Sequence, residues 1–312
     1  TGQASPAVLV RASVKSVFGD VSPVVPAAMT KTGRELLGVV NGSDPLEVLV
    51  PSLEIKSIEQ STPLADVVNT VTVALKANCD LLPGSTITIT GLTGSVSASA
   101  TLVVRSEAGG LEATGEWLDV GNMTLTSNGM TRRQTYEARF NLTNPATGQA
   151  SPAVLVRASV KSVLGDFVAI ALSSMDSTPS ADAFGVANGR DTLFVVIPKF
   201  LVLSISQSNP ASDMVNTFTV ILQSSCDVSS DSTVVISGLT GTASLDNQEL
   251  AVTSSLGSFE EHGEWHRTSG TLTLTTASTL SSAIAYTVTF NLTNPSESQP
   301  SPTILISSTI ES

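Results

Sequence analysis

The sequence has little of the chemistry on which most enzymes depend. Aromatic residues make up 4% of the 312 residues and charged residues 13%, the latter roughly half the usual fraction. Only two histidines are present, so acid–base schemes and triads built on histidine have little to work with. The sequence therefore predicts a protein that is not an enzyme, with no catalytic residues, no cofactor and no metal site.

Two partner classes are also excluded by what is missing. The net charge is −12 and no basic run occurs, which argues against binding to nucleic acid or to anionic membrane surfaces. No stretch approaches 18 apolar residues, so we expect no membrane insertion in this segment. The chain opens within a repeat on Thr1 and without Met, and we expect it to be an interior piece of a longer protein.

What the sequence does have is a tandem duplication. Thr1–Val17 recurs letter for letter at Thr147–Val163, and the segment FNLTNP at 140–145 returns at 290–295. The offset grows from 146 to 150 residues, so the period is near 147. A unit of that length can bury a core of its own.

Alternation with a period of two residues dominates each repeat. Segments 69–75, 85–90 and 136–142 place apolar residues on one face and Thr, Asn or charged residues on the other, which is typical of half-buried β-strands. No window of 12 residues carries a helical apolar stripe, so little helix is expected. Turn signals recur every 8–12 residues or so, the spacing of a β-sandwich. The pairs Asn41-Gly42 and Asn188-Gly189 predict tight hairpins with positive φ.

The module boundaries follow from the segment that closes each repeat. We expect residues 1–17 to be a closing strand of a preceding or neighbouring module, with sandwich modules at 18–163 and 164–312. Boundaries near Pro51 and Pro198 are the alternative. Because residues 1–17 are identical to the closing strand of the first module, we expect them to fill the same kind of groove elsewhere by strand exchange.

Glycosylation acceptors are the clearest local signal. Asn41, Asn122, Asn141 and Asn291 each begin an N-x-S/T motif, the acceptor of covalent glycans in secreted proteins. Asn141 and Asn291 correspond between the repeats, and the alternation places both on the outer face.

The two cysteines and the two tryptophans also occupy matching positions. Cys79 and Cys226 lie one period apart, too far for an intramolecular disulfide, so we expect small buried residues or a bridge to another chain. Trp117 and Trp265 each follow Gly-Glu. We interpret them as structural anchors, with a platform that stacks against sugars as the alternative.

Two kinds of polar motif resemble metal sites, but neither is interpreted as one. His262 and His266 stand four residues apart beside Glu264, a spacing that suits metal binding on a helix, but this stretch reads as loop and strand. The segments 41–44 and 188–191 (NGSD and NGRD) are interpreted as turns, with a calcium site between modules as the alternative.

Taken together, GSTITITGLTG at 84–94 and FNLTNPATGQASP at 140–152 resemble a tandem repeat of very large surface proteins of single-celled algae. The resemblance covers nearly the whole chain. It implies immunoglobulin-like or adhesin-like sandwiches in extracellular arrays, and it carries no catalytic residues.

The sequence thus predicts an all-β chain of two tandem immunoglobulin-like β-sandwich modules of about 147 residues. The predicted function is structural: a repeat segment of an extracellular, glycosylated fibre, sheath or flagellar hair of mastigoneme type. Such a segment would be built by end-to-end and lateral self-association, as a homopolymer or tandem array. The alternative is a cell-surface adhesin or carbohydrate-binding repeat protein. A groove lined by the tryptophans would favour the adhesin, and buried tryptophans would favour the fibre.

Overall fold

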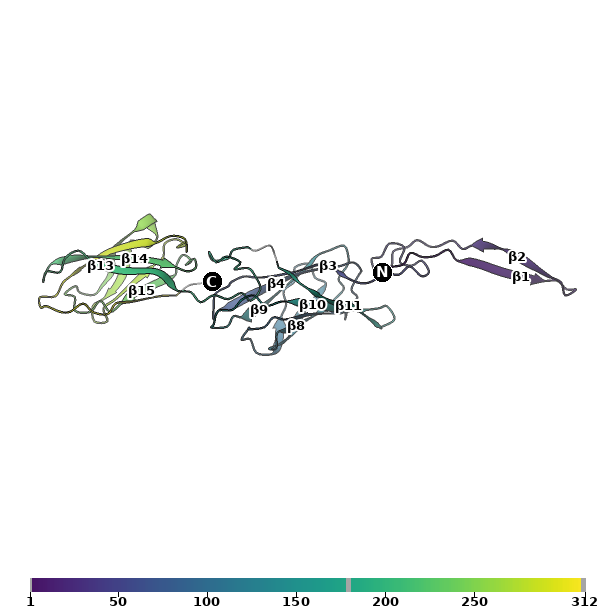
Figure 1. The fold of residues 1–312 in the computed structure, drawn as a ribbon, viewed down its shortest axis with the longest axis horizontal. Helices are drawn as coiled ribbons and strands as arrows, with labels where there is room; N and C mark the ends of the chain where they lie inside the picture. Colours follow the sequence, from purple (N-terminus) through teal and green to yellow (C-terminus); the bar gives the residue numbers. More distant parts are fainter. Residues whose placement is uncertain (1, 178–180, 310–312) are drawn as a thin grey trace. The chain divides into compact units, whose positions relative to one another are not determined.

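The computed structural model describes residues 2–177 and 181–309 and shows an all-β chain (Figure 1). Within these ranges the only helix is a 3-10 turn at Ser255–Gly257. Thr1 and residues 310–312, which belong to the predicted closing segments, lie outside them. The strands up to residue 177 are β1 (Leu9–Lys15), β2 (Val21–Ala28), β3 (Leu53–Gln60), β4 (Val68–Ala77), β5 (Thr86–Thr90), β6 (Ala100–Val103), β7 (Leu111–Leu118), β8 (Asn122–Ser127), β9 (Tyr136–Thr143), β10 (Leu155–Lys161), β11 (Phe167–Ser174) and β12 (Asp176–Ser177).

The strands of the second repeat follow the same order. They are β13 (Phe200–Gln207), β14 (Val215–Ser224), β15 (Thr233–Ser237), β16 (Asn247–Ser254), β17 (His262–His266), β18 (Thr271–Thr275), β19 (Tyr286–Thr293) and β20 (Leu305–Thr309).

The strands form where the apolar residues alternate. In β4, Val71, Val73 and Leu75 are fully buried, while Thr70, Thr72 and Ala74 on the opposite face are half-buried. Successive side chains of a strand point to opposite faces, so one face joins the core and the hydroxyl-bearing face meets water. The predicted alternation at 69–75, 85–90 and 136–142 is therefore confirmed.

Strands β3 to β12 form two sheets. One has six strands in the order β11-β10-β5-β8-β7-β6, and the other has four in the order β12-β3-β4-β9. The six-stranded sheet is antiparallel throughout, whereas β12 pairs with β3 in parallel. Buried side chains from both sheets, such as Ile87 and Phe140, make up the core.

The second repeat joins its two halves through one strand. Its eight strands follow the order β13-β14-β19-β16-β17-β18-β15-β20, and β16 pairs with both β19 and β17. The core includes Trp265 and Phe290, and the Phe290 ring stacks on Phe218 with the centroids 5.5 Å apart. The predicted fold class, all-β with immunoglobulin-like sandwiches, is confirmed.

The chain divides into two compact units that do not coincide with the sequence repeats. The first holds the described residues up to Glu59, with 70–142 and 152–177; the second holds 60–69, 143–151 and the described residues from 181 onward. The hairpins β1–β2 and β10–β11 each span a predicted boundary, at 17/18 and 163/164. The division into modules at those points stays a prediction.

Candidate functional site

At two of the four predicted glycosylation acceptors, the side-chain nitrogen makes no hydrogen bond to a described residue. Asn141 on β9 and Asn291 on β19 are exposed, and their Oδ1 atoms accept hydrogen bonds from Thr70 Oγ1 (3.0 Å) and Thr217 Oγ1 (2.7 Å). The Nδ2 atom, which would carry the sugar, donates to no described residue at either site. Asn41 is exposed in a loop, whereas Asn122 is half-buried on β8, so the four acceptors are not equally exposed. Glycosylation at the four sites stays a prediction.

Both cysteines are free and buried. Burial raises the pKa of the Cys79 thiol; Asp80 raises it further and Arg132 opposes the shift. Burial also raises the pKa of the Cys226 thiol, against a lowering hydrogen bond from Ser224. A bridge to another chain stays a prediction, and it would require these buried sulfurs to become exposed.

The tryptophans are core residues. Trp117 and Trp265 are each 1% exposed. Their indole N–H groups donate to the backbone carbonyls of Ser97 (3.0 Å) and Ser244 (3.4 Å). Buried in this way, neither ring offers a face for stacking against a sugar.

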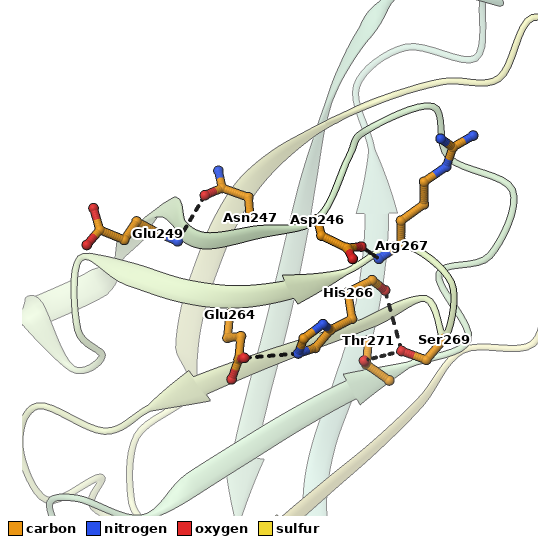
Figure 2. A network of polar contacts seen from close by, with 8 residues as sticks. All are labelled: Asp246, Asn247, Glu249, Glu264, His266, Arg267, Ser269 and Thr271. Atoms are coloured by element: carbon orange, nitrogen blue, oxygen red, sulfur yellow. Dashed lines mark hydrogen bonds and ion pairs between the residues drawn. The ribbon is translucent and has the colours of Figure 1, made fainter.

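The histidines lie on the outer face of β17, as Figure 2 shows for His266 and its neighbours. His266 Nε2 and Glu264 Oε1 are 3.0 Å apart, and both side chains are about half exposed. The backbone N–H of Arg267 donates to Asp246 Oδ1 at 2.7 Å on the adjoining turn. Across residues 2–177 and 181–309 no group of three or more His, Cys, Asp or Glu is placed to hold a metal ion.

A buried polar network organises a site that the sequence reasoning did not single out. Asn69 Nδ2 donates to Gln60 Oε1 (2.8 Å) and to Asn144 Oδ1 (2.9 Å). Asn144 Nδ2 in turn donates to the carbonyls of Thr62 (3.1 Å) and Leu64 (2.8 Å). One sequence feature could have indicated this network: a glutamine, an asparagine and an Asn-Pro pair recur at matching positions of the two repeats. Side-chain amides that recur at the same spacing predict hydrogen bonds to the backbone.

Gln60 uses its side-chain amide to hold a segment from far along the chain. Its Nε2 donates to the carbonyls of Gly189 (2.9 Å) and Phe194 (2.8 Å), and its Oε1 accepts from the Leu193 N–H (2.8 Å). The amide is 1% exposed, so these contacts replace water completely. We call residues 189–196 the docked segment, and we call residues 60–69 with 143–151, which belong to the same compact unit, the filled groove.

Backbone pairing on both sides fixes the docked segment. Val195 exchanges two hydrogen bonds with Gln149, each 2.9 Å long. The Val196 N–H donates to the Pro63 carbonyl (2.8 Å), and the Ala65 N–H donates to the Val196 carbonyl (3.0 Å). The segment therefore lies as a short added strand between the two walls of the groove.

Apolar contacts complete the filled groove. Leu193 is fully buried, and Val195 is nearly so. A separate apolar cluster forms around Leu64, Val186 and Cys226, with Phe184 and Phe194 packed against it. Burial of side chains of this size is worth about 1.5–3 kcal/mol each.

The second repeat builds the same groove, and no segment of the described residues fills it. Asn216 Nδ2 donates to Gln207 Oε1 and to Asn294 Oδ1, both at 2.9 Å, as the equivalent residues do in the first repeat. Gln207 is exposed, and its Nε2 has no partner among the described residues. Around it lies a groove of about 460 Å³, whose walls include Pro210, Gln299 and Ser301.

Comparisons with known proteins found similarity among solved structures alone. No protein-family model matches the chain, and no curated protein matches it. Among solved structures, the chain is similar to the MSCRAMM ACE of Enterococcus faecalis, which binds its ligands by the collagen Hug model (9% identity, TM-score 0.21), covering 82% of this chain and 93% of that one.

Two further solved structures give the same picture. The collagen adhesin CNA of S. aureus is 12% identical with a TM-score of 0.23, over 83% of this chain and 86% of that one. The collagen-binding domain of RspB from Erysipelothrix rhusiopathiae is 12% identical with a TM-score of 0.22, over 85% and 90%. Similarity this weak carries no argument about what the chain binds.

Proposed function

We propose that this chain is a structural repeat segment of an extracellular fibre or sheath, built by end-to-end self-association. The observation that carries the proposal is the pair of grooves. The groove of the first repeat is filled by a segment of the chain, while the groove of the second repeat has the same polar network and a Gln207 whose Nε2 has no partner among the described residues. A groove that can bind an extended segment, and that no described residue fills, supports self-assembly more directly than it supports catalysis.

The secreted setting has two supports. The resemblance to repeats of algal surface proteins points outside the cell, and the exposed Asn141 and Asn291 leave their Nδ2 atoms available for glycan. Within the described parts of the chain no helix could span a membrane. Lateral association and the mastigoneme-like appendage belong to the same proposal.

Negative-stain electron microscopy of the protein at rising concentration tests this function. We expect particles to join into linear assemblies as the concentration rises. Dispersed single particles at the highest concentration would count against the proposal.

The adhesin alternative has less support within the molecule. A groove lined by Trp117 and Trp265 would favour it, but both side chains are buried. Three similar solved structures come from collagen-binding surface proteins, but their TM-scores are too low to transfer that property. A solid-phase assay on collagen would separate the two functions, because saturable binding by the isolated chain would favour the adhesin.

A further inference from the structure

The first unit carries a second version of the docked segment. Residues 36–50, which we call the plug loop, match residues 183–197 at an offset of 147, so that Leu46 corresponds to Leu193 and Val48 to Val195. The two stretches share Asn-Gly and an Asp two residues after the Gly, and each is followed directly by a proline, Pro51 or Pro198.

The plug loop already has the conformation of the docked segment. Leu46 has φ 64° and Leu193 has φ 53°, while Asn41 and Asn188 both have φ 59°. The short bridge between Leu36 and Val39 repeats the one between residues 183 and 186. A leucine in the left-handed region is strained, and here the strain is kept without a groove around it. Because the loop is preformed, docking would lose little conformational entropy.

The base of the plug loop is fixed to its own unit. The Asp80 N–H donates to the Leu37 carbonyl (2.9 Å), and Asp80 Oδ1 accepts from the Arg132 N–H (2.8 Å). Arg132 Nη1 also donates to the Gly38 carbonyl (2.6 Å). These contacts hold one side of the loop and leave Leu46 64% exposed, whereas Leu193 is 0% exposed.

The outer edge of the plug loop has an exchangeable partner. Val48 exchanges two 2.8 Å hydrogen bonds with Gln3, as Val195 does with Gln149. Ser5 Oγ donates to the Pro45 carbonyl, as Ser151 Oγ donates to that of Thr192. The residues at these positions in the open groove are Gln299 and Ser301, so the same bonds can be formed there without a net loss.

We propose that the plug loop of one molecule docks in the open groove of a second molecule of this chain. This inference deepens the proposed function, on which it rests, by naming the two surfaces. In the docked state Gln207 Nε2 donates to the carbonyls of Gly42 and Glu47, and Gln207 Oε1 accepts from the Leu46 N–H.

The backbone of the open groove is ready for the rest of the strand. The Pro210 carbonyl and the Ser212 N–H have no partners among the described residues, and they correspond to the groups that bind Val196 in the filled groove. In the docked state Leu49 of the plug loop occupies the position that Val196 has in the filled groove. Gln299 replaces Gln3 opposite Val48, and its side chain leaves the Thr240 carbonyl, to which it now donates at 3.1 Å.

In one respect the plug loop suits a groove of this kind better than the docked segment suits the filled groove. Thr192 Oγ1 is buried without a hydrogen-bond partner in the filled groove. The plug loop has Pro45 at this position, which buries no hydroxyl and presets φ before Leu46.

Sedimentation velocity at rising concentration tests the proposal through two variants with a matched control. Gln207→Glu keeps the acceptor for Asn216 but cannot donate to the plug loop, so it should weaken association about 10-fold or more. Leu46→Asp places a charge where a leucine should be buried, and should weaken it about 100-fold. Leu245→Asp changes another exposed leucine (73%) that does not line the groove, and it should leave association unchanged. Circular dichroism spectra establish that each variant is folded.

The outcomes separate the docking from the function it rests on. Association that falls in both variants and persists in the control supports the proposal. If the wild type and the three variants associate with equal strength, the two proposed docking surfaces are wrong, while the proposed self-association is still supported. A wild-type chain that stays monomeric throughout overturns both.

Discussion

At the residue scale, the amides and glycines that recur in both repeats are explained by geometry. Asn144 is fully buried and satisfies two carbonyls and one amide, whereas Asn294 makes the same bonds in a partly exposed site. Gly91 has φ 89°, and a Cβ there would lie 2.2 Å from the Ala153 carbonyl oxygen. The repeated GLTG motif is therefore a close crossing of two chain segments.

Asn144→Ala should lower the free energy of unfolding by about 2–4 kcal/mol, because it orphans buried groups that water cannot reach. Asn294→Ala is the matched control. The two carbonyls it binds, of Asn209 and Ala211, belong to partly or fully exposed residues, and only Asn216 Nδ2 is a buried partner, so the loss should be smaller, about 1–2 kcal/mol. Urea unfolding of both variants measures the difference. Equal losses would show that burial does not set the value of this network.

Gly91→Ala should cost about 3 kcal/mol or more, since positive φ and a collision with backbone act together. Gly109→Ala provides the comparison. Its φ is 67° and no atom lies within 4 Å of the added Cβ, so about 1 kcal/mol is expected. Thermal unfolding of the pair decides whether the close approach adds to the backbone strain; a similar shift in both would argue that it does not.

The cysteine thiols predict a pH dependence of stability. The pKa of each is raised in the folded chain above an ordinary value of 9.0. The unfolded chain therefore loses these protons first, and the stabilisation is present below pH 9 and is lost as the pH rises through and above it. Stability measured between pH 8 and pH 10 should fall more steeply for the wild type than for a Cys79→Ala/Cys226→Ala variant. Parallel curves would contradict the burial of these thiols.

At the element scale, the strands could be predicted and the groove could not. Alternation gives the face of each residue in β4 or β9, because the side-chain period of a strand is two. The contact of Gln60 with Gly189 joins residues 129 apart, and no local pattern encodes it. The Asn41-Gly42 and Asn188-Gly189 pairs show the same limit. Both asparagines have positive φ as expected, but the predicted tight hairpins are wrong: each Asn-Gly pair follows a short bridge, at Leu36–Val39 or Ala183–Val186, and lies in a compact loop whose contacts are with distant residues.

Two strands with one sequence offer a direct test of environment. β1 and β10 both read LVRASVK, yet β1 pairs only with β2 and is exposed at every residue, while β10 lies between β5 and β11. A lone hairpin is marginally stable in water. Amide hydrogens of β1 should exchange at least about 100-fold faster than those of β10, whose intrinsic rates are the same.

Hydrogen exchange followed by mass spectrometry measures both peptides in one sample. Equal protection of β1 and β10 in dilute protein would mean that β1 has a partner that the hairpin alone does not supply. Protection of β1 that appears only in concentrated protein would locate strand exchange through residues 1–17.

At the scale of the whole molecule, the proposed assembly depends on two complementary surfaces. The plug loop and the open groove reproduce, on separate units, the two halves of a contact that the chain already makes once. Low charge and a hydroxyl-covered exterior suit close packing of such molecules, and repetition of one contact would give length.

The most direct measurement is a disulfide cross-link between two differently labelled molecules, one carrying Val48→Cys and the other Gln299→Cys. Paired strands place such residues within disulfide reach, and Gln149→Cys with Val195→Cys in one chain calibrates the yield. The native thiols are buried and should stay unreactive. The account predicts a heterodimer from the Val48/Gln299 pair and none when Leu245→Cys replaces Gln299→Cys; equal yields from the two pairs, or no cross-link in either, would contradict it.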